Sequence, residues 1–172
     1  MKCCIVFSSC TGNTRKVAEA IAQGTNIPCF PVQNAPAPQA YDMLALGFWV
    51  RKGLPDTRSR RYMARVYGKH VFLFGTLGAW PHSEHALHCL AATRALLEDG
   101  GNTILDAFLC QGRVNPRVVA ATQRKGTHPL SIERIHRLHE AARHPTTEDC
   151  ATARHRWQQA LQSVQMHTAV FL

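Results

Sequence analysis

The chain has 172 residues, of which 45% are hydrophobic and 18% are charged. This composition excludes a disordered protein and is typical of a globular one, and the length suits one domain with a sizeable core. We therefore expect residues 1–172 to form a single domain. No apolar run approaches the roughly 20 residues that a membrane span needs, and the N-terminus lacks a signal-peptide pattern. We expect a cytoplasmic protein that does not contact a membrane.

The formal net charge is +9, which raises the question of nucleic acid. The basic residues are not interleaved with aromatic ones, however, and no helix-turn-helix or zinc module is visible. We therefore expect no nucleic-acid partner. The seven cysteines include no Cys-x-x-Cys pair, so we expect reduced thiols and no metal. Three histidines, His82, His85 and His88, follow one another at a spacing that turns round a helix, which does not favour a shared metal ion.

Apolar runs and helical stretches alternate along the first two thirds of the chain. The apolar runs predict five strands, at residues 3–7, 28–32, 43–48, 70–75 and 103–110. Helical patterns occupy 14–23, 57–67 and 83–97, and three more follow at 117–123, 131–143 and 147–164. Continuous apolar strands separated by helices indicate a parallel sheet that is covered on both faces. We expect residues 1–112 to form the sheet and its loops, and residues 113–172 to form a helical C-terminal region.

The loop after the first strand reads Ser8-Ser9-Cys10-Thr11-Gly12-Asn13-Thr14 and leads directly into a helix. Backbone N–H groups in the first turn of a helix have no intrahelical partner, and the helix dipole adds partial positive charge there. The hydroxyl groups add donors, and Gly12 allows close approach of a ligand. The loop lacks both the Gly-Lys-Ser/Thr ending of a nucleotide P-loop and the Gly-x-Gly-x-x-Gly spacing of dinucleotide sites. It therefore predicts a site for a permanently bound monophosphate, and we call residues 8–14 the phosphate loop.

Two later loops each carry one of the three tryptophans of the chain. They are residues 47–53, with Trp49, and residues 75–81, with Trp80. In a doubly wound sheet these loops reach the edge where ligands bind. A Trp beside Gly-containing backbone suits a flat ring that has hydrogen-bonding edges.

At Ser9, Thr11, Gly12, Asn13 and Thr14 the first loop resembles that of the flavodoxin family, Thr/Ser-x-Thr-Gly-Asn-Thr, which binds the phosphate of FMN. The resemblance implies an α/β flavodoxin-like fold: a five-stranded parallel sheet, doubly wound with helices on both faces, here with extra C-terminal helices. It implies that FMN is the cofactor and that the two Trp loops flank its ring. The predicted cofactor residues are Ser8, Ser9, Cys10, Thr11, Gly12, Asn13, Thr14, Phe48, Trp49, Val50, Gly53, Thr76, Leu77, Gly78, Trp80, Gln111 and Gly112.

Two of these assignments leave alternatives open. Gly78 and Gly53 are both candidates for the peptide that faces flavin N5. Gln111 and Gly112 follow the fifth strand at the same edge, but a simple turn from strand to helix explains them equally well.

The sequences Gly-Phe-Trp-Val-x-Lys-Gly at 47–53 and Gly-Thr-Leu-Gly-Ala-x-Pro-x-Ser-Glu-His-Ala at 75–86 resemble one branch of flavodoxin-like proteins. Some members of that branch accompany bilirubin-reducing enzymes in gut anaerobes. This chain differs from typical flavodoxins, which are strongly acidic, because a basic run follows its third strand. We expect Arg51, Lys52, Arg58 and Arg61 to bind a redox partner protein that has an acidic docking face.

The function that we expect is electron transfer, from a reductase or NAD(P)H-linked donor through FMN to a partner reductase. The alternative is an enzyme, an FMN-dependent NAD(P)H oxidoreductase acting directly on a quinone or another small anionic or aromatic acceptor. A third possibility is a scaffold that has lost the flavin. Only Cys10 in the phosphate loop favours the third, and the two loop tryptophans argue against it.

Overall fold

The computed structural model of the chain describes residues 1–127 and 129–170. Five parallel strands form the sheet, in the spatial order β2-β1-β3-β5-β6. They are β1 (Cys3–Phe7), β2 (Cys29–Pro31), β3 (Met43–Arg51), β5 (His70–Leu77) and β6 (Thr103–Gln111). A two-residue strand, β4 (Leu54–Pro55), pairs antiparallel with the end of β3. The expected five-stranded parallel sheet is confirmed, and β4 is an addition that the sequence did not predict.

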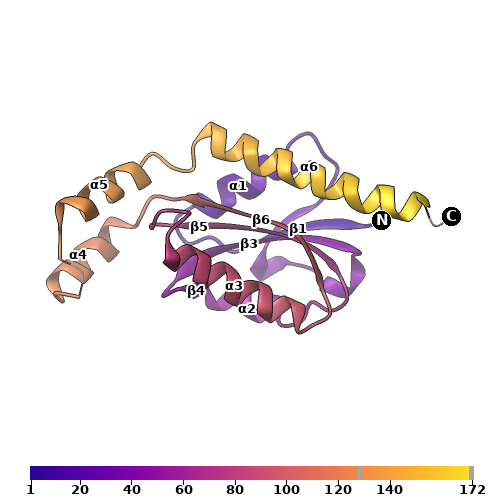
Figure 1. Cartoon of the computed structure of the whole chain (residues 1–172), viewed down its shortest axis with the longest axis horizontal. Coiled ribbons are helices and arrows are strands. Elements are labelled where there is room, and N and C mark those ends of the chain that lie inside the picture. The colour runs from indigo at the N-terminus through magenta and orange to yellow at the C-terminus, as the bar shows by residue number, and fades with distance from the viewer. Residues whose placement is uncertain (128, 171–172) are drawn as a thin grey trace.

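Helices cover both faces of this sheet (Figure 1). On one face lie α1 (Asn13–Ala22) and α6 (Thr147–Val170), and on the other lie α2 (Thr57–Met63) and α3 (Glu84–Glu98). Two single-turn 3-10 helices, η1 (Val32–Asn34) and η2 (Pro38–Ala40), connect β2 to β3. The remaining helices, α4 (Pro116–Arg124) and α5 (Ile132–Ala141), lie between β6 and α6 in the chain. No helix in the described ranges is long and apolar enough to cross a membrane.

Each face of the sheet has its own apolar core. On the α1 and α6 face, Trp157 is fully buried, and its ring centroid lies 5.6 Å from that of Phe72. On the α2 and α3 face, Phe48 and Met63 are buried beside Leu97. Helix α6, which begins after residue 145, therefore completes the core of the sheet that starts at residue 3.

The segment after residue 48, expected to be a loop, is instead a β-hairpin. β3 continues through Trp49 to Arg51, and Val50 pairs with Pro55 across to β4. Lys52 and Gly53 form the turn, with φ angles of 53° and 76°. Two consecutive positive φ angles are the signature of the type I′ hairpin turn, whose twist matches that of the paired strands. The hairpin fixes the direction of Trp49 more firmly than a loop would.

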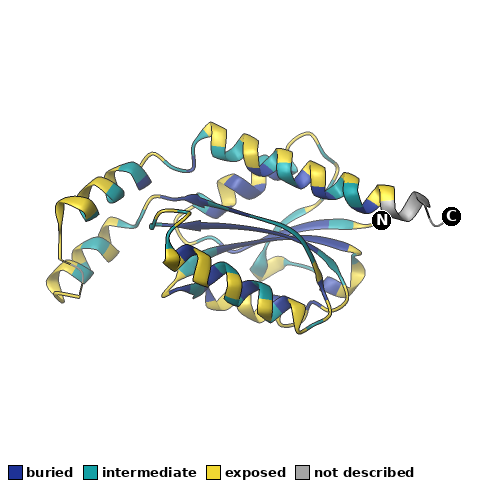
Figure 2. Cartoon of the chain, viewed as in Figure 1, coloured by how far each residue is buried: buried dark blue, intermediate teal, exposed yellow. Residues whose placement is uncertain are grey.

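The segment from residue 113 to residue 145, which we call the arm, extends past the edge where the strands end (left in Figure 1). Most of its surface is exposed (Figure 2): no residue of α4 is buried, and α5 buries only Ala141. Both helices have one apolar and one polar face, and the apolar side chains of Val118 on α4 and Ile132 on α5 are 52% and 89% exposed. Tertiary burial therefore does little to hold the arm in place.

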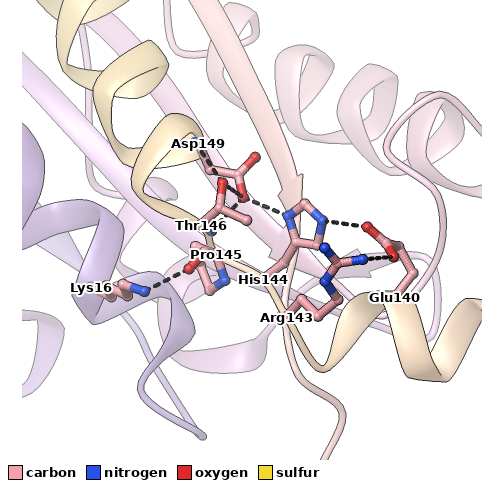
Figure 3. A network of polar contacts seen from close by, with 7 residues as sticks. All are labelled: Lys16, Glu140, Arg143, His144, Pro145, Thr146 and Asp149. Carbon is pink, nitrogen blue, oxygen red and sulfur yellow. Dashed lines mark hydrogen bonds and ion pairs between the residues drawn. The ribbon is translucent and has the colours of Figure 1, made fainter.

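Polar contacts fix the place where the arm returns to the sheet (Figure 3). His144 bridges α5 and α6, because its Nδ1 lies 2.5 Å from Asp149 Oδ2 and its Nε2 lies 3.3 Å from Glu140 Oε1. From α1, Lys16 Nζ donates to the Pro145 carbonyl at 2.6 Å. Burial alone would lower the pKa of His144, but the hydrogen bonds to Asp149 and Glu140 outweigh it and raise that pKa above its ordinary value of 6.5.

Candidate FMN site

Helix α1 begins without a side-chain cap. Its N-cap residue is Gly12, with a φ of 90°, and the described part of the chain shows no side-chain cap hydrogen bond there. By contrast, side chains cap the starts of α2, α3, α4 and α5: those of Asp56, Ser83, Asn115 and Ser131. The first N–H groups of α1 are thus left available to a ligand, and the helix dipole favours an anion there.

The phosphate loop is ordered by its own side chains. Ser9 Oγ accepts a hydrogen bond from the Gly12 N–H at 3.1 Å, and Asn13 Nδ2 donates to Thr11 Oγ1 at 3.0 Å. Asn13 Nδ2 also donates to the Arg113 carbonyl at 3.0 Å, which ties the loop to the start of the arm. The loop is therefore preorganised before any ligand binds, which reduces the entropy lost on binding.

Two hydroxyl groups of the predicted loop face the protein. Ser8 is buried, and its Oγ donates to Asp56 Oδ1 at 2.8 Å. Thr14 is also buried, and its Oγ1 lies 2.9 Å from Thr76 Oγ1 on β5. These hydroxyls position the loop against the sheet, and Thr11 is left as an exposed hydroxyl beside the first turn of α1.

Asp56 is a positioning residue that sequence reasoning missed. It is 3% exposed, and it accepts hydrogen bonds from Ser8 Oγ, the N–H groups of Arg58 and Ser59, and Ser59 Oγ. An Asp before a helix is a recognisable N-cap signal. Its bond to Ser8 spans 48 positions of sequence, and no local pattern indicates such a contact.

A cavity of about 200 Å³, which we call the slot, opens where the phosphate loop, β3, β5 and the arm meet. Its lining residues are Cys10, Thr11, Asn13, Thr14, Trp49, Val50, Thr76, Leu77, Gly78, Gly112, Arg113, Val114, Asn115 and Val118. The structure thus brings together most of the predicted cofactor residues, from four separate parts of the chain. Their roles toward the cofactor remain predictions.

The slot requires two glycines. A Cβ atom on Gly112 would lie 2.5 Å from Asn13 Nδ2, and one on Gly78 would overlap Val114 Cγ2. Contacts this short do not occur between real side chains, so any larger residue at either position would displace Asn13 or Val114. Gly112 therefore has a packing role that its place in a strand-to-helix turn does not explain.

The other predicted cofactor residues do not line the slot. Ser9 and Gly12 face a cavity of about 680 Å³ on the other side of the phosphate loop. Phe48 is fully buried in the core, and a Cβ on Gly53, in the hairpin turn, would lie 3.5 Å from His85 Cε1.

Gln111 and Trp80 also lie outside the slot. Gln111 is 2% exposed at the end of β6, and its Nε2 has no hydrogen-bond partner among the described residues. Trp80 is 36% exposed and packs toward His136 on α5, with ring centroids 6.2 Å apart. The two loop tryptophans thus have different surroundings, and Trp49 is the one in the slot.

The arm contributes four slot residues that we did not assign to the cofactor: Arg113, Val114, Asn115 and Val118. The pair Asn115-Pro116 carries a signal, because Asn favours the N-cap and Pro the first helical position, and Asn115 Oδ1 does accept from the Arg117 N–H at 2.9 Å. That signal predicts where α4 begins. It does not predict that α4 begins at the slot.

The predicted partner-binding residues are all exposed. Lys52, in the hairpin turn, also lines a cavity beside the arm, and Arg58 and Arg61 line a cavity of about 420 Å³ together with Val32 and Gln33 of η1. Their roles toward a partner remain predictions.

All seven cysteines are free thiols. Burial raises the pKa of Cys4, Cys29 and Cys89 to about 11, so these thiols are protonated at neutral pH. Cys10 is exposed and lines the slot. Among the described residues, no group of three or more His, Cys, Asp or Glu side chains could hold a metal ion.

Comparisons with known proteins agree with this geometry. A family model described as a flavodoxin domain matches residues 4–158. The flavodoxin-like domain-containing protein BilS of Clostridioides difficile (strain CD3) is 31% identical over 120 residues, which cover 66% of this chain and 68% of that protein.

Among solved structures, a flavodoxin from the domain Archaea superimposes with a TM-score of 0.59 at 15% identity, covering 96% of this chain and 99% of that one. A flavoprotein in complex with FMN from Lactobacillus acidophilus has a TM-score of 0.50 at 14% identity, covering 63% and 92%.

The uncapped start of α1 suits a phosphate group, and Trp49 in the adjoining slot suits a flat ring. The residues present thus agree with the match over residues 4–158. The chain belongs to the flavodoxin family and binds FMN.

Proposed function

We propose that this chain is an electron carrier that takes electrons from a reductase or an NAD(P)H-linked donor and passes them to a partner reductase. One observation carries the proposal: the uncapped start of α1 and the Trp49 side of the slot meet at the edge where all the parallel strands end. When bound, FMN supplies the electron chemistry, and the protein supplies binding, orientation and electrostatics.

In this proposal the phosphate is held by the first-turn N–H groups of α1 and by the Thr11 hydroxyl. Trp49 packs against the ring, and the backbone from Thr76 to Gly78 presents donors and acceptors to the ring edge. Asn13 keeps the phosphate loop and the arm in one arrangement through its bonds to Thr11 and Arg113. Asp56 holds Ser8, and with it the start of the loop, in place.

The charges nearest the slot support docking of an acidic partner. Arg113 lines the slot and is exposed, and Arg51 and Lys52 are exposed at the tip of the hairpin. Basic side chains around a redox centre attract an acidic protein surface and raise the rate of encounter, an effect that salt screens.

A second candidate function is an FMN-dependent NAD(P)H oxidoreductase that acts directly on a small acceptor. One observation supports this function: a further cavity of about 610 Å³ adjoins the slot and shares Gly78, Val114 and Val118 with it. Steady-state oxidation of NAD(P)H by the isolated, FMN-loaded protein would support the enzyme. Turnover only with a second protein would support the carrier.

The FMN assignment is tested by titrating FMN into the flavin-free protein and following flavin fluorescence. We expect one FMN per chain, and we expect Trp49→Ala to weaken binding about tenfold, since stacking contacts are worth about 0.5–1.5 kcal/mol beyond the buried area. Trp80→Ala is the matched control, because Trp80 lies outside the slot. Equal losses in both variants would contradict the proposed position of the ring, and no binding by the unaltered protein would contradict the proposed function.

A further inference from the structure

The cavity of about 610 Å³ lies between the arm and the sheet, and we call it the arm cavity. Its walls are the β5–α3 connection, the start of α3, the hairpin turn and both arm helices. The lining residues are Lys52, Gly78, Ala79, Trp80, Ser83, His85, Val114, Val118, Val119, Thr122, Glu133, Arg134, Arg137 and Leu138. It is a separate space from the slot, although the two share a wall.

The lining combines apolar surface with positive charge. Trp80, Val118 and Leu138 provide apolar surface. Lys52, Arg134 and Arg137 are the cations, and Glu133 is the one carboxylate among the lining residues. A ligand that suits such walls has an apolar body and a negative charge.

Arg137 is the lining arginine whose guanidinium has no hydrogen-bond or ion-pair partner among the described residues, and its Nε is buried. Arg134, one turn earlier, is already engaged, because its Nη2 donates to Thr122 Oγ1 at 2.9 Å and its Nη1 to the Pro129 carbonyl at 3.5 Å. A guanidinium carries five N–H donors, so Arg137 keeps donors that an anionic ligand in the cavity can satisfy.

We propose that the arm cavity binds a small organic anion, in which a flat apolar ring system carries a carboxylate. The guanidinium of Arg137 holds the carboxylate, since its planar fork matches two carboxylate oxygens, and Lys52 adds to the positive field. The ring system packs beside Trp80 and Val118. Because Gly78, Val114 and Val118 border both spaces, the ligand lies next to whatever occupies the slot.

This inference deepens the second candidate function by naming a substrate class, and it rests on the proposed function only in placing FMN in the slot. The arm gains a role from it: α4 and α5 bury almost nothing of their own, yet they supply half of the wall of a site for an anion.

The three tryptophans provide a direct test. Trp49 lines the slot, Trp80 lines the arm cavity and Trp157 is buried in the core, so three indole N–H signals in a ¹H–¹⁵N spectrum report three places. The probe is 2-naphthoate, titrated into the FMN-loaded full-length protein. We expect the signals of Trp80 and of Arg137 Nε–H to shift with saturation while that of Trp157 stays in place. Its uncharged analogue 2-naphthalenemethanol should bind at least tenfold more weakly.

Charge variants locate the anion. We expect Arg137→Gln to weaken 2-naphthoate binding about 10- to 100-fold, the loss that follows removal of a hydrogen bond to a charged group. Arg117→Gln makes the same charge change on the same arm outside the cavity, and it should change binding less than twofold. Equal weakening by both variants, or equal binding of the acid and the alcohol, would overturn the proposal.

Failure of this inference is distinguishable from failure of the proposed function. If FMN binds and shifts Trp49 but 2-naphthoate leaves Trp80 unchanged, the arm-cavity proposal is wrong and the carrier stands. If 2-naphthoate binds only the flavin-free protein, the flavin itself fills the arm cavity and the proposal is again wrong. If FMN does not bind at all, the proposed function fails whatever 2-naphthoate does.

Discussion

Different interactions hold the two regions of the molecule in place: apolar packing holds the sheet and its four covering helices, and polar contacts hold the arm. In the sheet, side chains such as Phe72 and Trp157 are completely buried, and position follows from packing. In the arm, Ile132 is 89% exposed and the whole of α4 buries no residue. What holds the arm is polar: the Asn13–Arg113 bond where it leaves the sheet and the His144 contacts where it returns. Stability therefore resides in the sheet, whereas the arm shapes the two cavities and buries little surface.

We expect the largest loss in the free energy of unfolding for a substitution in the packed core of the sheet. Trp157→Ala removes a fully buried ring on α6, and we expect a loss of about 3–5 kcal/mol in the free energy of unfolding. Trp157→Phe should cost less than Trp157→Ala, because it leaves a smaller cavity and the Trp157 indole N–H has no partner to lose among the described residues. Urea denaturation followed by far-UV circular dichroism measures both.

Ile132→Ala is the arm counterpart of that experiment. At 89% exposure the side chain has little contact to lose, so we expect a change within about 0.5 kcal/mol. A loss close to that of Trp157→Ala would show that the apolar face of the arm is covered in solution, and the contrast between the two regions would be wrong.

The second prediction concerns Asp56, whose hydrogen bonds join the phosphate loop to the start of α2. Asp56→Ala leaves the hydroxyls of Ser8 and Ser59 and the first N–H groups of α2 without their acceptor. We expect a loss of about 2–3 kcal/mol, combining a lost helix cap with buried donors left unpaired, and weaker FMN binding because Ser8 is released. Asp56→Asn, which still caps a helix, should lose less. If Asp56→Ala leaves FMN affinity unchanged, the loop does not depend on this joint.

The parts of the fold that the sequence predicted are those with local signals. The strand at residues 3–7 and the last helix were predictable, because continuous apolar runs and helical spacing are local signals of burial. The hairpin at Trp49 was not, since the Lys52-Gly53 turn was interpreted as part of an open loop although its type I′ conformation continues the strand.

The site divides in the same way. The phosphate loop is contiguous in sequence, and the two glycine-and-Trp loops have local signatures, so most residues of the slot could be proposed in advance. Asp56 and Val114 could not, because each acts through a partner far away in sequence: Ser8 for Asp56, and Gly78 for Val114. Local chemistry thus predicts which residues line the slot better than it predicts which residues hold them in place.

The third effect tests the boundary between the sheet and the arm. A methyl group at Gly78 would overlap Val114, so we expect Gly78→Ala to cost about 1–3 kcal/mol and to displace the arm from the slot. The double variant Gly78→Ala with Val114→Ala removes the overlap and should recover most of the loss. A double-mutant cycle in urea, with FMN affinity measured alongside, gives the coupling energy. Simple additivity of the two substitutions would contradict the contact.

The smallest effect is a dependence on pH at the place where the arm returns to the sheet. Burial opposes the charge on His144, but the hydrogen bonds to Asp149 and Glu140 raise its pKa above 6.5 in the folded protein. A raised pKa means that the protonated form stabilises the folded state: the contribution is complete below pH 6.5 and is lost as the pH rises through the folded value. The pKa of Glu140 is lowered, first by its hydrogen bond with His144, so its effect on stability falls below pH 4.5 and outside this window.

The free energy of unfolding of the unaltered protein should therefore fall between pH 6 and pH 8.5 by more than that of His144→Gln. His139→Gln, on the exposed face of the same helix, should retain the fall. Identical slopes in all three proteins would mean that the charge of His144 does not hold the arm, and that Lys16 and the other contacts at the joint are sufficient.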